Sequence, residues 1–221
     1  MRKKLAALAA AFVLCLAGTA CGNAAKTYTD YVQAVMDCTY LGQDVTYRKL
    51  TKSADAEVQA LIDDENRYLC SQLCHQASVD SAKLSPETAE SYTQLADTLR
   101  SKVKYSVADA VSSGNTYQVT ITAEPLDLFI VSVPDMETAY RKEFSEKFYK
   151  ASEGTPQYDK LEADWGARAL EIYQSHAETV GCLEAQSITV SIRADADGHY
   201  NISSADWQKI DQLLFGLAKP Q

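Results

Sequence analysis

Tyr117-Gln118-Val119-Thr120-Ile121-Thr122-Ala123 alternates apolar and polar side chains. Successive side chains of a strand point to opposite faces of the sheet, so this alternation predicts a strand with one buried face and one face in water. The earlier run Val103, Tyr105, Val107 alternates in the same way, and the intervening Ser112-Ser113-Gly114-Asn115 consists of turn-forming residues. Together these segments predict an antiparallel β-hairpin.

A second hairpin is predicted closer to the end of the sequence. Residues 188–192 alternate in the same pattern, the pair Asp197-Gly198 favours a tight turn, and residues 200–202 alternate after it. Two hairpins predict an antiparallel sheet of about four strands. Between the hairpins, Pro125 and Pro134 bracket an apolar crossing, which we expect either to extend a strand or to run over the core.

Helical periodicity with clear start signals covers most of the remaining chain. Thr27–Asp30 has the form of a capping box, and Gly42 follows the apolar stripe that it opens. Ser85-Pro86 predicts another start, because Ser caps helices and Pro is favoured at the first helical position. Further helices are predicted from Ser53, along residues 136–148, along residues 161–180, and from the capping box Ser203–Asp206.

These elements predict an α+β fold. An amphipathic helix buries one stripe and an antiparallel sheet buries one face, so we expect the helices to cover one side of the sheet. No linker-like segment divides residues 27–221, which we interpret as a single α+β domain. By analogy alone, scaffolds of the cystatin-like or nuclear-transport-factor-like kind, in which helices wrap a curved sheet, fit this pattern.

The first 20 residues have the three parts of an export signal. A basic start precedes an apolar run from Leu5 to Ala17, and the small residues Gly18-Thr19-Ala20 stand directly before Cys21. The apolar run is shorter than the roughly 20 residues that cross a bilayer. We interpret residues 1–20 as a lipoprotein signal peptide and Cys21 as the lipidation site, which would carry a thioether diacylglycerol and palmitate-like acyl chains.

Plain secretion is the alternative. A lipobox usually carries Leu three places before the cysteine, where this chain has Gly18, and the same small residues suit an ordinary signal peptidase. With the lipid, residues 21–26 form a tether, in which the five residues that follow Cys21 reach at most about 18 Å when extended. Two acyl chains anchor stably where one holds only marginally. We therefore expect a protein anchored to the cell membrane on its extracytoplasmic face.

The net charge of the chain limits the classes of partner that we expect. Three of the 21 Lys and Arg residues lie in the leader, which holds no acidic residue; the remaining 18 stand against 30 Asp and Glu, a net charge of −12. Such an acidic chain repels phosphate backbones, so nucleic acid is not an expected partner. The expected partners are the membrane, through the lipid on Cys21, and a protein, peptide or glycan ligand of the cell envelope.

Four cysteines remain after the leader and Cys21: Cys38, Cys70, Cys74 and Cys182. An even number in an exported protein favours disulfides. Cys70 and Cys74 stand four apart on a predicted helix, about 5–6 Å between Cβ atoms, which is too far for a mutual bridge. Buried free thiols are one alternative, and a zinc site that adds His75 is another.

No catalytic motif stands out. The sequence lacks a Gly-x-Ser-x-Gly elbow, a His-Glu-x-x-His helix, a phosphate loop and a dinucleotide fingerprint. His176 lies on an apolar stripe, where we expect a boundary histidine with a satisfied hydrogen bond; His75 and His199 are no stronger candidates, and no cysteine has the local context of a peptidase nucleophile. Asp195–Gly198 resembles the start of a calcium loop but fits a hairpin turn better. We expect no catalytic residue, cofactor or metal site.

Two further groups of residues are candidates for binding or surface features. The chain has 13 Tyr, most of them on predicted apolar stripes, with Tyr47, Tyr149 and Tyr158 as candidates to face a ligand. Asp63-Asp64-Glu65 is interpreted as a solvated helix face.

Several runs resemble a group of lipoproteins of unknown function from gut-dwelling Gram-positive bacteria. The resemblance lies in Tyr31-Val32 with Asp37–Gly42, in Tyr117–Asp127, and in Asp197-Gly198 through Ile210-Asp211. The cysteines depart from that group. The group brings no established activity, so the resemblance implies an address and an architecture only.

Three functions follow as hypotheses. The leading one is a non-enzymatic, membrane-anchored binding or interaction module. The first alternative is an envelope hydrolase that uses carboxylates in a cleft between sheet and helices, which a concave polar pocket with a perturbed acid or base would favour. The second is a structural component of a surface complex, which would expose an apolar patch of several hundred Å².

Overall fold

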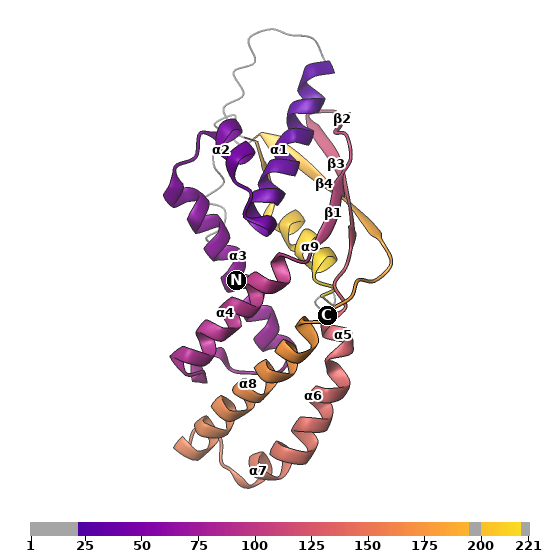
Figure 1. Cartoon of the computed structure of the whole chain (residues 1–221). Helices are drawn as coiled ribbons and strands as arrows, with labels where there is room; N and C mark the ends of the chain where they lie inside the picture. Colours follow the sequence, from indigo (N-terminus) through magenta and orange to yellow (C-terminus); the bar gives the residue numbers. More distant parts are fainter. Residues whose placement is uncertain (1–21, 195–199, 218–221) are drawn as a thin grey trace. The chain divides into compact units, whose positions relative to one another are not determined.

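The computed structural model describes residues 22–194 and 200–217 (Figure 1). Its residues group into two compact units. Unit 1 contains the described residues up to Glu65, residues 103–125 and those from Leu183 onward; unit 2 contains residues 66–102 and 126–182. The single domain expected over residues 27–221 stays a prediction. Cys21, the leader, the turn Asp197-Gly198 and His199 lie outside the described residues.

The antiparallel sheet lies in unit 1. Its central strands are β3 (Thr116–Glu124) and β4 (Gln186–Ala194), paired so that Val119 faces Val190 and Ile121 faces Ile188. Both β1 (Lys104–Val107) and β2 (Val111–Ser113) pair with the other edge of β3, and β5 (Tyr200–Ile202) pairs with β4. The predicted α+β class with an antiparallel sheet is confirmed.

A β-bulge explains why β1 and β2 are separate pieces. Val107 is paired with Ile121 and Val111 with Gln118, so three residues on one side oppose two on the other. Within the bulge the amide of Ala110 donates to Thr29 Oγ1 at 2.8 Å, a contact from the covering helix. The two pieces therefore act as one bent edge strand, which reconciles five strand segments with the four that were expected.

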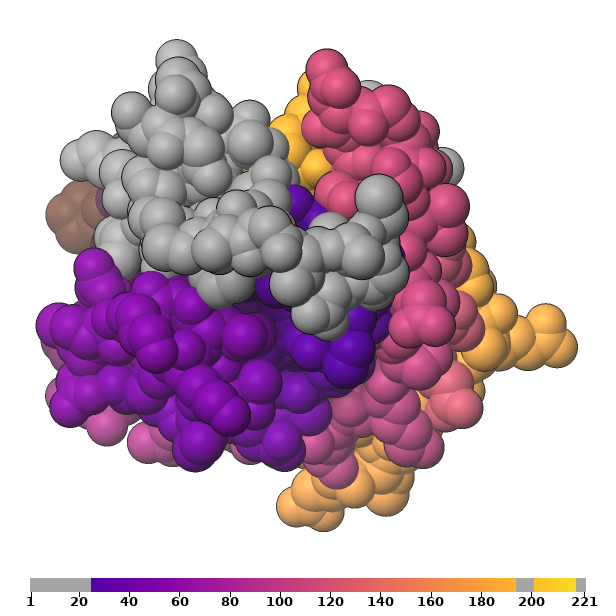
Figure 2. All heavy atoms as spheres, turned by 90° about the horizontal axis from the view of Figure 1, so that it is seen from above, coloured from indigo at the N-terminus to yellow at the C-terminus, as the bar shows by residue number. Residues whose placement is uncertain are grey.

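Helices cover one face of this sheet. α1 (Gly22–Leu41) and α9 (Ser204–Leu214) pack on the side that carries the buried residues of β3 and β4, and α2 (Val45–Thr51) packs on α1. Figures 1 and 2 show α1 beside the strands β1–β3. Inward residues are buried and their chain neighbours are not, as the alternation predicted. The buried sheet residues are Val119, Ile121, Ala123, Val190 and Ile192.

Polar contacts fix the helices against the strands in the core of unit 1. Tyr40 on α1 is 1% exposed, and its hydroxyl donates to Asp211 Oδ1 on α9 at 2.5 Å. Tyr105 on β1 donates to Asp37 Oδ1 at 2.7 Å. Because buried polar groups are costly without partners, these bonds select one helix register on the sheet.

Unit 2 is helical, and α8 (Pro156–Ala177) is its central helix (Figure 1). It contacts α4 (Pro86–Arg100) and the 3-10 turn η2 (Ser81–Lys83), and also the run formed by α5 (Leu128–Val131), α6 (Val133–Ala139), the π-helical turn η3 (Tyr140–Phe144) and α7 (Ser145–Lys150). Residues 66–76 of α3 (Asp55–Gln76) also belong to it. The indole of Trp165 donates to the carbonyl of Ala77 at 2.8 Å, which fixes α8 against the end of α3.

Predicted helix starts are partly confirmed. Ser85 Oγ accepts a bond from the amide of Thr88 at 3.2 Å, and Ser203 Oγ accepts one from Asp206 at 3.1 Å. The capping box at Thr27 is wrong, because α1 already begins at Gly22. Ala24 and Ala25 favour helix and nothing there breaks it. Thr29 instead bonds the carbonyl of Ala25, as residues inside a helix do.

Other expectations are corrected. Residues 126–133 form no strand beyond the isolated bridge between Leu126 and Cys182; the apolar crossing folds into α5 and the start of α6. Helix α2 was not predicted, since its seven residues are too few for a periodic pattern. Glu65 is 6% exposed, so the Asp63–Glu65 run is not wholly solvated. Among the described residues, no helix is both long and apolar enough to cross a membrane.

Candidate functional site

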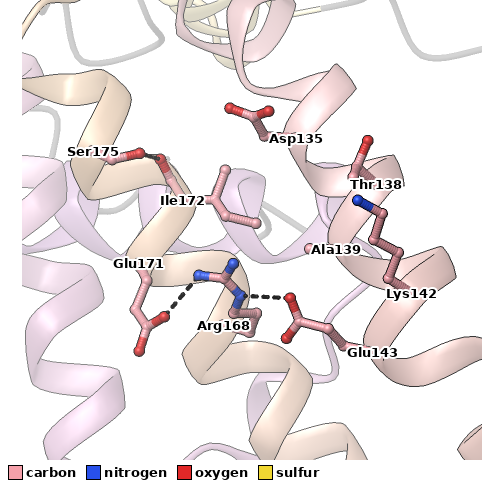
Figure 3. Close-up of a pocket in the computed structure, with 9 residues that line it drawn as sticks. All are labelled: Asp135, Thr138, Ala139, Lys142, Glu143, Arg168, Glu171, Ile172 and Ser175. Carbon is pink, nitrogen blue, oxygen red and sulfur yellow. Dashed lines mark hydrogen bonds and ion pairs between the residues drawn. The ribbon is translucent and has the colours of Figure 1, made fainter.

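A groove of about 350 Å³ lies within unit 2, between the α6–η3 segment and α8 (Figure 3). Side chains of the two helical segments face each other across it. Most of them are charged or carry hydroxyls. The lining residues are Asp135, Thr138, Ala139, Lys142, Glu143, Arg168, Glu171, Ile172 and Ser175.

Helix periodicity places these side chains on facing stripes. Asp135, Thr138 and Lys142 follow one another at spacings of three and four on the α6–η3 wall. Arg168, Ile172 and Ser175 do the same on α8. The π-helical turn η3 adds residues per turn, so the neighbours Lys142 and Glu143 both line the groove while Phe144 stays buried. Such π-turns are frequent at functional sites.

Arg168 bridges the two walls. Its Nη1 donates to Glu171 Oε2 at 2.9 Å on its own helix, and its Nε donates to Glu143 Oε1 at 3.4 Å on the opposite wall (Figure 3). The hydrogen bond to Glu171 and the charge of Glu143 raise the pKa of Arg168 above its ordinary value. The guanidinium is therefore a fixed cation whose charge two carboxylates already offset.

Lys142 is the second cation of the groove. It forms no hydrogen bond or ion pair with any residue that the structure describes, and its amine points away from Glu143 in Figure 3. Beside it, Ala139 and Ile172, each 5% exposed, form an apolar floor. The groove thus combines an apolar floor with a cation available to an anionic group.

His176 lies at one end of the groove. Its Nε2 is 2.9 Å from Asp135 Oδ2, which confirms the expected boundary histidine with a satisfied hydrogen bond. The neighbouring Ser175 does not complete a catalytic triad, because its hydroxyl donates to the carbonyl of Ile172 at 2.7 Å instead. This end of the groove offers acceptor oxygens but no activated serine.

None of the four described cysteines lines the groove. No disulfide joins Cys38, Cys70, Cys74 or Cys182 in the described part of the chain, so the expected disulfides are not seen. Cys38 and Cys74 are buried; burial raises the pKa of the Cys74 thiol to about 11 and also raises that of Cys70. These features favour the alternative of buried thiols that pack as small hydrophobic side chains.

The remaining candidate residues from the sequence do not come together in one site. Tyr47 is 4% exposed and cannot face a ligand, and Tyr158 packs edge-on against Phe148; Tyr149, at 90% exposure, does face solvent. His75 is exposed, and the described residues contain no group of three or more His, Cys, Asp or Glu that could hold a metal. The Asp195–Gly198 segment lies outside the described residues.

Sequence reasoning found His176 but missed the groove around it. The charged residues of the groove follow or precede apolar positions on amphipathic helices. Each one taken alone is typical of an exposed helix face and so does not indicate a site. A signal existed in the repeat of polar side chains at i, i+3 and i+7 on two separate helical segments, but only the contact of these segments in the fold makes their faces one site.

Exposed apolar side chains also occur in unit 2. Ile130, Val131 and Val133 on α5 and at the start of α6 are 57%, 37% and 47% exposed. The surface-complex alternative would place its contact here.

The fold has a solved counterpart. A crystal structure of a protein described as a "putative lipoprotein" (ycdA) from Bacillus subtilis subsp. subtilis str. 168 matches with a TM-score of 0.54 and 15% sequence identity. The match covers 86% of this chain and 57% of that protein, so this chain spans little more than half of its length. No family model and no curated protein matches the sequence.

This likeness defines a class at the level of the fold: a mixed α+β protein with a curled antiparallel sheet packed against helices. The matching protein from Bacillus subtilis is one solved example of this class. The lipoprotein description belongs to that protein, and the resemblance to a gut-dwelling group stays a prediction.

Proposed function

We propose that the protein is a membrane-anchored extracytoplasmic lipoprotein, and that it binds a small polar ligand in the groove between α6–η3 and α8. The anchor rests on the leader and Cys21, and the description of the structural counterpart supports it. The binding function rests on the groove.

Lys142 is the observation that carries the binding function. Lys142 is exposed and its ammonium has no described partner, so a bond to it is still available beside the buried Ala139 and Ile172. A ligand with an acidic or hydroxyl oxygen supplies that bond. The groove volume of about 350 Å³ also falls in the range of small-molecule sites.

Binding is favoured over hydrolysis by how the polar groups are engaged. Glu143 and Glu171 both accept from Arg168, Asp135 bonds His176, and Ser175 donates within its own helix. A hydrolase that uses carboxylates needs one of them poised as a base against a water or a nucleophile. The arrangement supports a recognition site in which charges hold one another in place.

A blocking substitution tests this function. Thr138 lines the groove and is exposed, so Thr138→Trp fills it without removing a charge. Gln174→Trp is the matched control, because Gln174 is also uncharged and exposed and stands next to Ser175 but outside the lining. Saturation-transfer NMR on detergent-extracted full-length protein would screen amino acids, dipeptides, monosaccharides and inorganic phosphate.

We expect transfer to at least one solute in the wild type and in Gln174→Trp, and its loss in Thr138→Trp. Signals that are equal in all three proteins, or transfer to no solute, would contradict a ligand site in this groove. Product peaks that grow during the same spectra would instead support the hydrolase.

A further inference from the structure

We infer that the groove takes a zwitterion, an amino acid or a short peptide, with its carboxylate at Lys142 and Thr138 and its ammonium at Asp135 and Ser175. This inference rests on the proposed function. It names the class of ligand and the direction in which the ligand lies.

The charges of the groove select against ligands of a single sign. Three carboxylates and two cations line it: Asp135, Glu143 and Glu171 against Lys142 and Arg168. Arg168 is held by Glu143 and Glu171, and Asp135 Oδ2 is bonded to His176. A ligand can therefore still reach Lys142 and the second carboxylate oxygen of Asp135, which carry opposite charges. A purely anionic ligand meets three carboxylates and a purely cationic one meets Lys142, whereas a zwitterion pairs with both ends.

Ser175 and Asp135 form the end of the groove that we assign to the ammonium group of the ligand. Ser175 spends its proton on the carbonyl of Ile172, so its oxygen remains as an acceptor. His176 bonds Asp135 and directly follows Ser175 in α8, so Asp135 and Ser175 lie at the same end of the groove. Two acceptors there suit an ammonium, which has donors only.

The other subsite has donors. Thr138 stands one helical turn before Lys142 on the same wall, and Figure 3 shows its hydroxyl and the Lys142 amine close together in that view. A hydroxyl and an ammonium together suit a carboxylate, and charge-assisted bonds of this kind are about twice as strong as neutral ones. The ligand therefore spans the groove from the Asp135 end to Lys142.

Size and the apolar floor limit what lies between the charges. A volume of about 350 Å³ lies near the lower end of the range for small-molecule sites, which suits a ligand of about ten non-hydrogen atoms. Ala139 and Ile172 offer apolar contact to an aliphatic side chain. A free amino acid such as leucine, or a small dipeptide, meets these limits, while a longer sugar chain exceeds them.

Blocked derivatives of one amino acid test the inference. Isothermal titration of the full-length protein would compare L-leucine with N-acetyl-leucine, which lacks the ammonium, with leucinamide, which lacks the carboxylate, and with neutral N-acetylglucosamine. We expect leucine to bind at least about tenfold more tightly than each of the others, since each blocked form loses one charge-assisted contact.

Two variants assign the ends. Lys142→Gln is expected to weaken leucine about tenfold and to leave leucinamide unchanged, because leucinamide has no carboxylate to lose. Asp135→Asn is expected to weaken leucine similarly and to leave N-acetyl-leucine unchanged. Lys150→Gln is the matched control: Lys150 is an exposed lysine on α7 that pairs with Glu146 outside the groove lining.

The outcomes separate the two proposals. If N-acetylglucosamine binds as tightly as leucine, or Lys142→Gln affects all probes equally, the zwitterion is wrong, and the binding groove stands provided that Thr138→Trp blocks that binding. If no probe binds but the solute screen finds a ligand that Thr138→Trp blocks, the zwitterion alone is wrong. If neither the titrations nor the screen finds a ligand that Thr138→Trp blocks, the proposed function fails as well.

Discussion

Asp206 shows how a single buried carboxyl joins two elements of unit 1. Its Oδ2 accepts from the amide of Ser191 on β4 at 3.2 Å, and its Oδ1 accepts from Lys209 on α9 at 2.7 Å. Burial alone would raise the pKa of Asp206, but the bonds from Lys209, Ser191 and Ser203 outweigh it and lower the pKa below its ordinary 3.8. The charged carboxylate thus pins α9 to the sheet.

Asp206→Asn tests this contact through its pH dependence. A pKa that is lower in the folded protein means that the stabilisation is complete above pH 3.8 and is lost as pH falls through the folded-state value. We expect the variant to lose about 1–2 kcal/mol of unfolding free energy at pH 7. Urea titrations of both proteins at several pH values measure this, and a difference that persists unchanged at pH 2 would rule out the titrating contact.

For single residues, the sequence predicts whether a side chain is buried better than it predicts which residue that side chain contacts. His176 was expected to be a satisfied boundary histidine because its place on an apolar stripe limits its surroundings. That its partner is Asp135 depends on α6 and α8 lying side by side, and no spacing in the sequence encodes that contact. Tyr47 was misassigned for another reason: it belongs to α2, a helix too short to show an apolar stripe, so the sequence did not indicate that Tyr47 is buried.

In unit 2, a side-chain cap determines where helix α4 begins. Ser85 Oγ accepts from the amide of Thr88 and opens α4, with Pro86 in the first turn. Ser at this position satisfies an amide that the helix itself leaves without a partner. The loss of unfolding free energy on removing a serine hydroxyl should therefore depend on whether that serine caps the helix or lies within it.

Ser85→Ala is therefore expected to lower the free energy of unfolding by about 1 kcal/mol. Ser91→Ala on the same helix is the control: the Ser91 hydroxyl only bonds back to the carbonyl of Glu87, and alanine is the better helix former. Thermal denaturation followed by circular dichroism compares the two. Equal melting temperatures for both variants would argue against the cap.

Elements with a strong local period were predicted well, and those shaped by contacts were not. The two hairpins and the starts at Ser85 and Ser203 follow from alternation and caps, which act within a few residues. The bulge between β1 and β2 involves an amide bonded to Thr29 on α1, and the π-helical turn η3 accommodates packing against α8. Both arise from tertiary contacts that a local pattern does not carry.

For the whole molecule, the net charge and the proposed membrane localisation depend on different parts of the sequence. Residues 21–221 carry a net charge of −12, which gives them no attraction to an anionic bilayer surface. Any lasting hold on the membrane then depends on the lipid proposed at Cys21, where each buried methylene contributes about 0.8 kcal/mol. The anchor and the groove are separable, so losing one should leave the other intact.

Cys21→Ser tests the anchor. Without the thiol no diacylglycerol can be attached, and Gly18-Thr19-Ala20 still offers an ordinary cleavage site, so we expect the chain in the medium with the substituted residue at its N-terminus. Cys15→Ser, inside the leader, is the matched control and should stay with the membrane after a high-salt wash. Intact mass spectrometry of wild-type protein extracted from membranes should show the added acyl mass on Cys21. A wild-type chain that carries no lipid, or a processed Cys21→Ser chain that remains with the membrane, would show that some other contact holds the protein there.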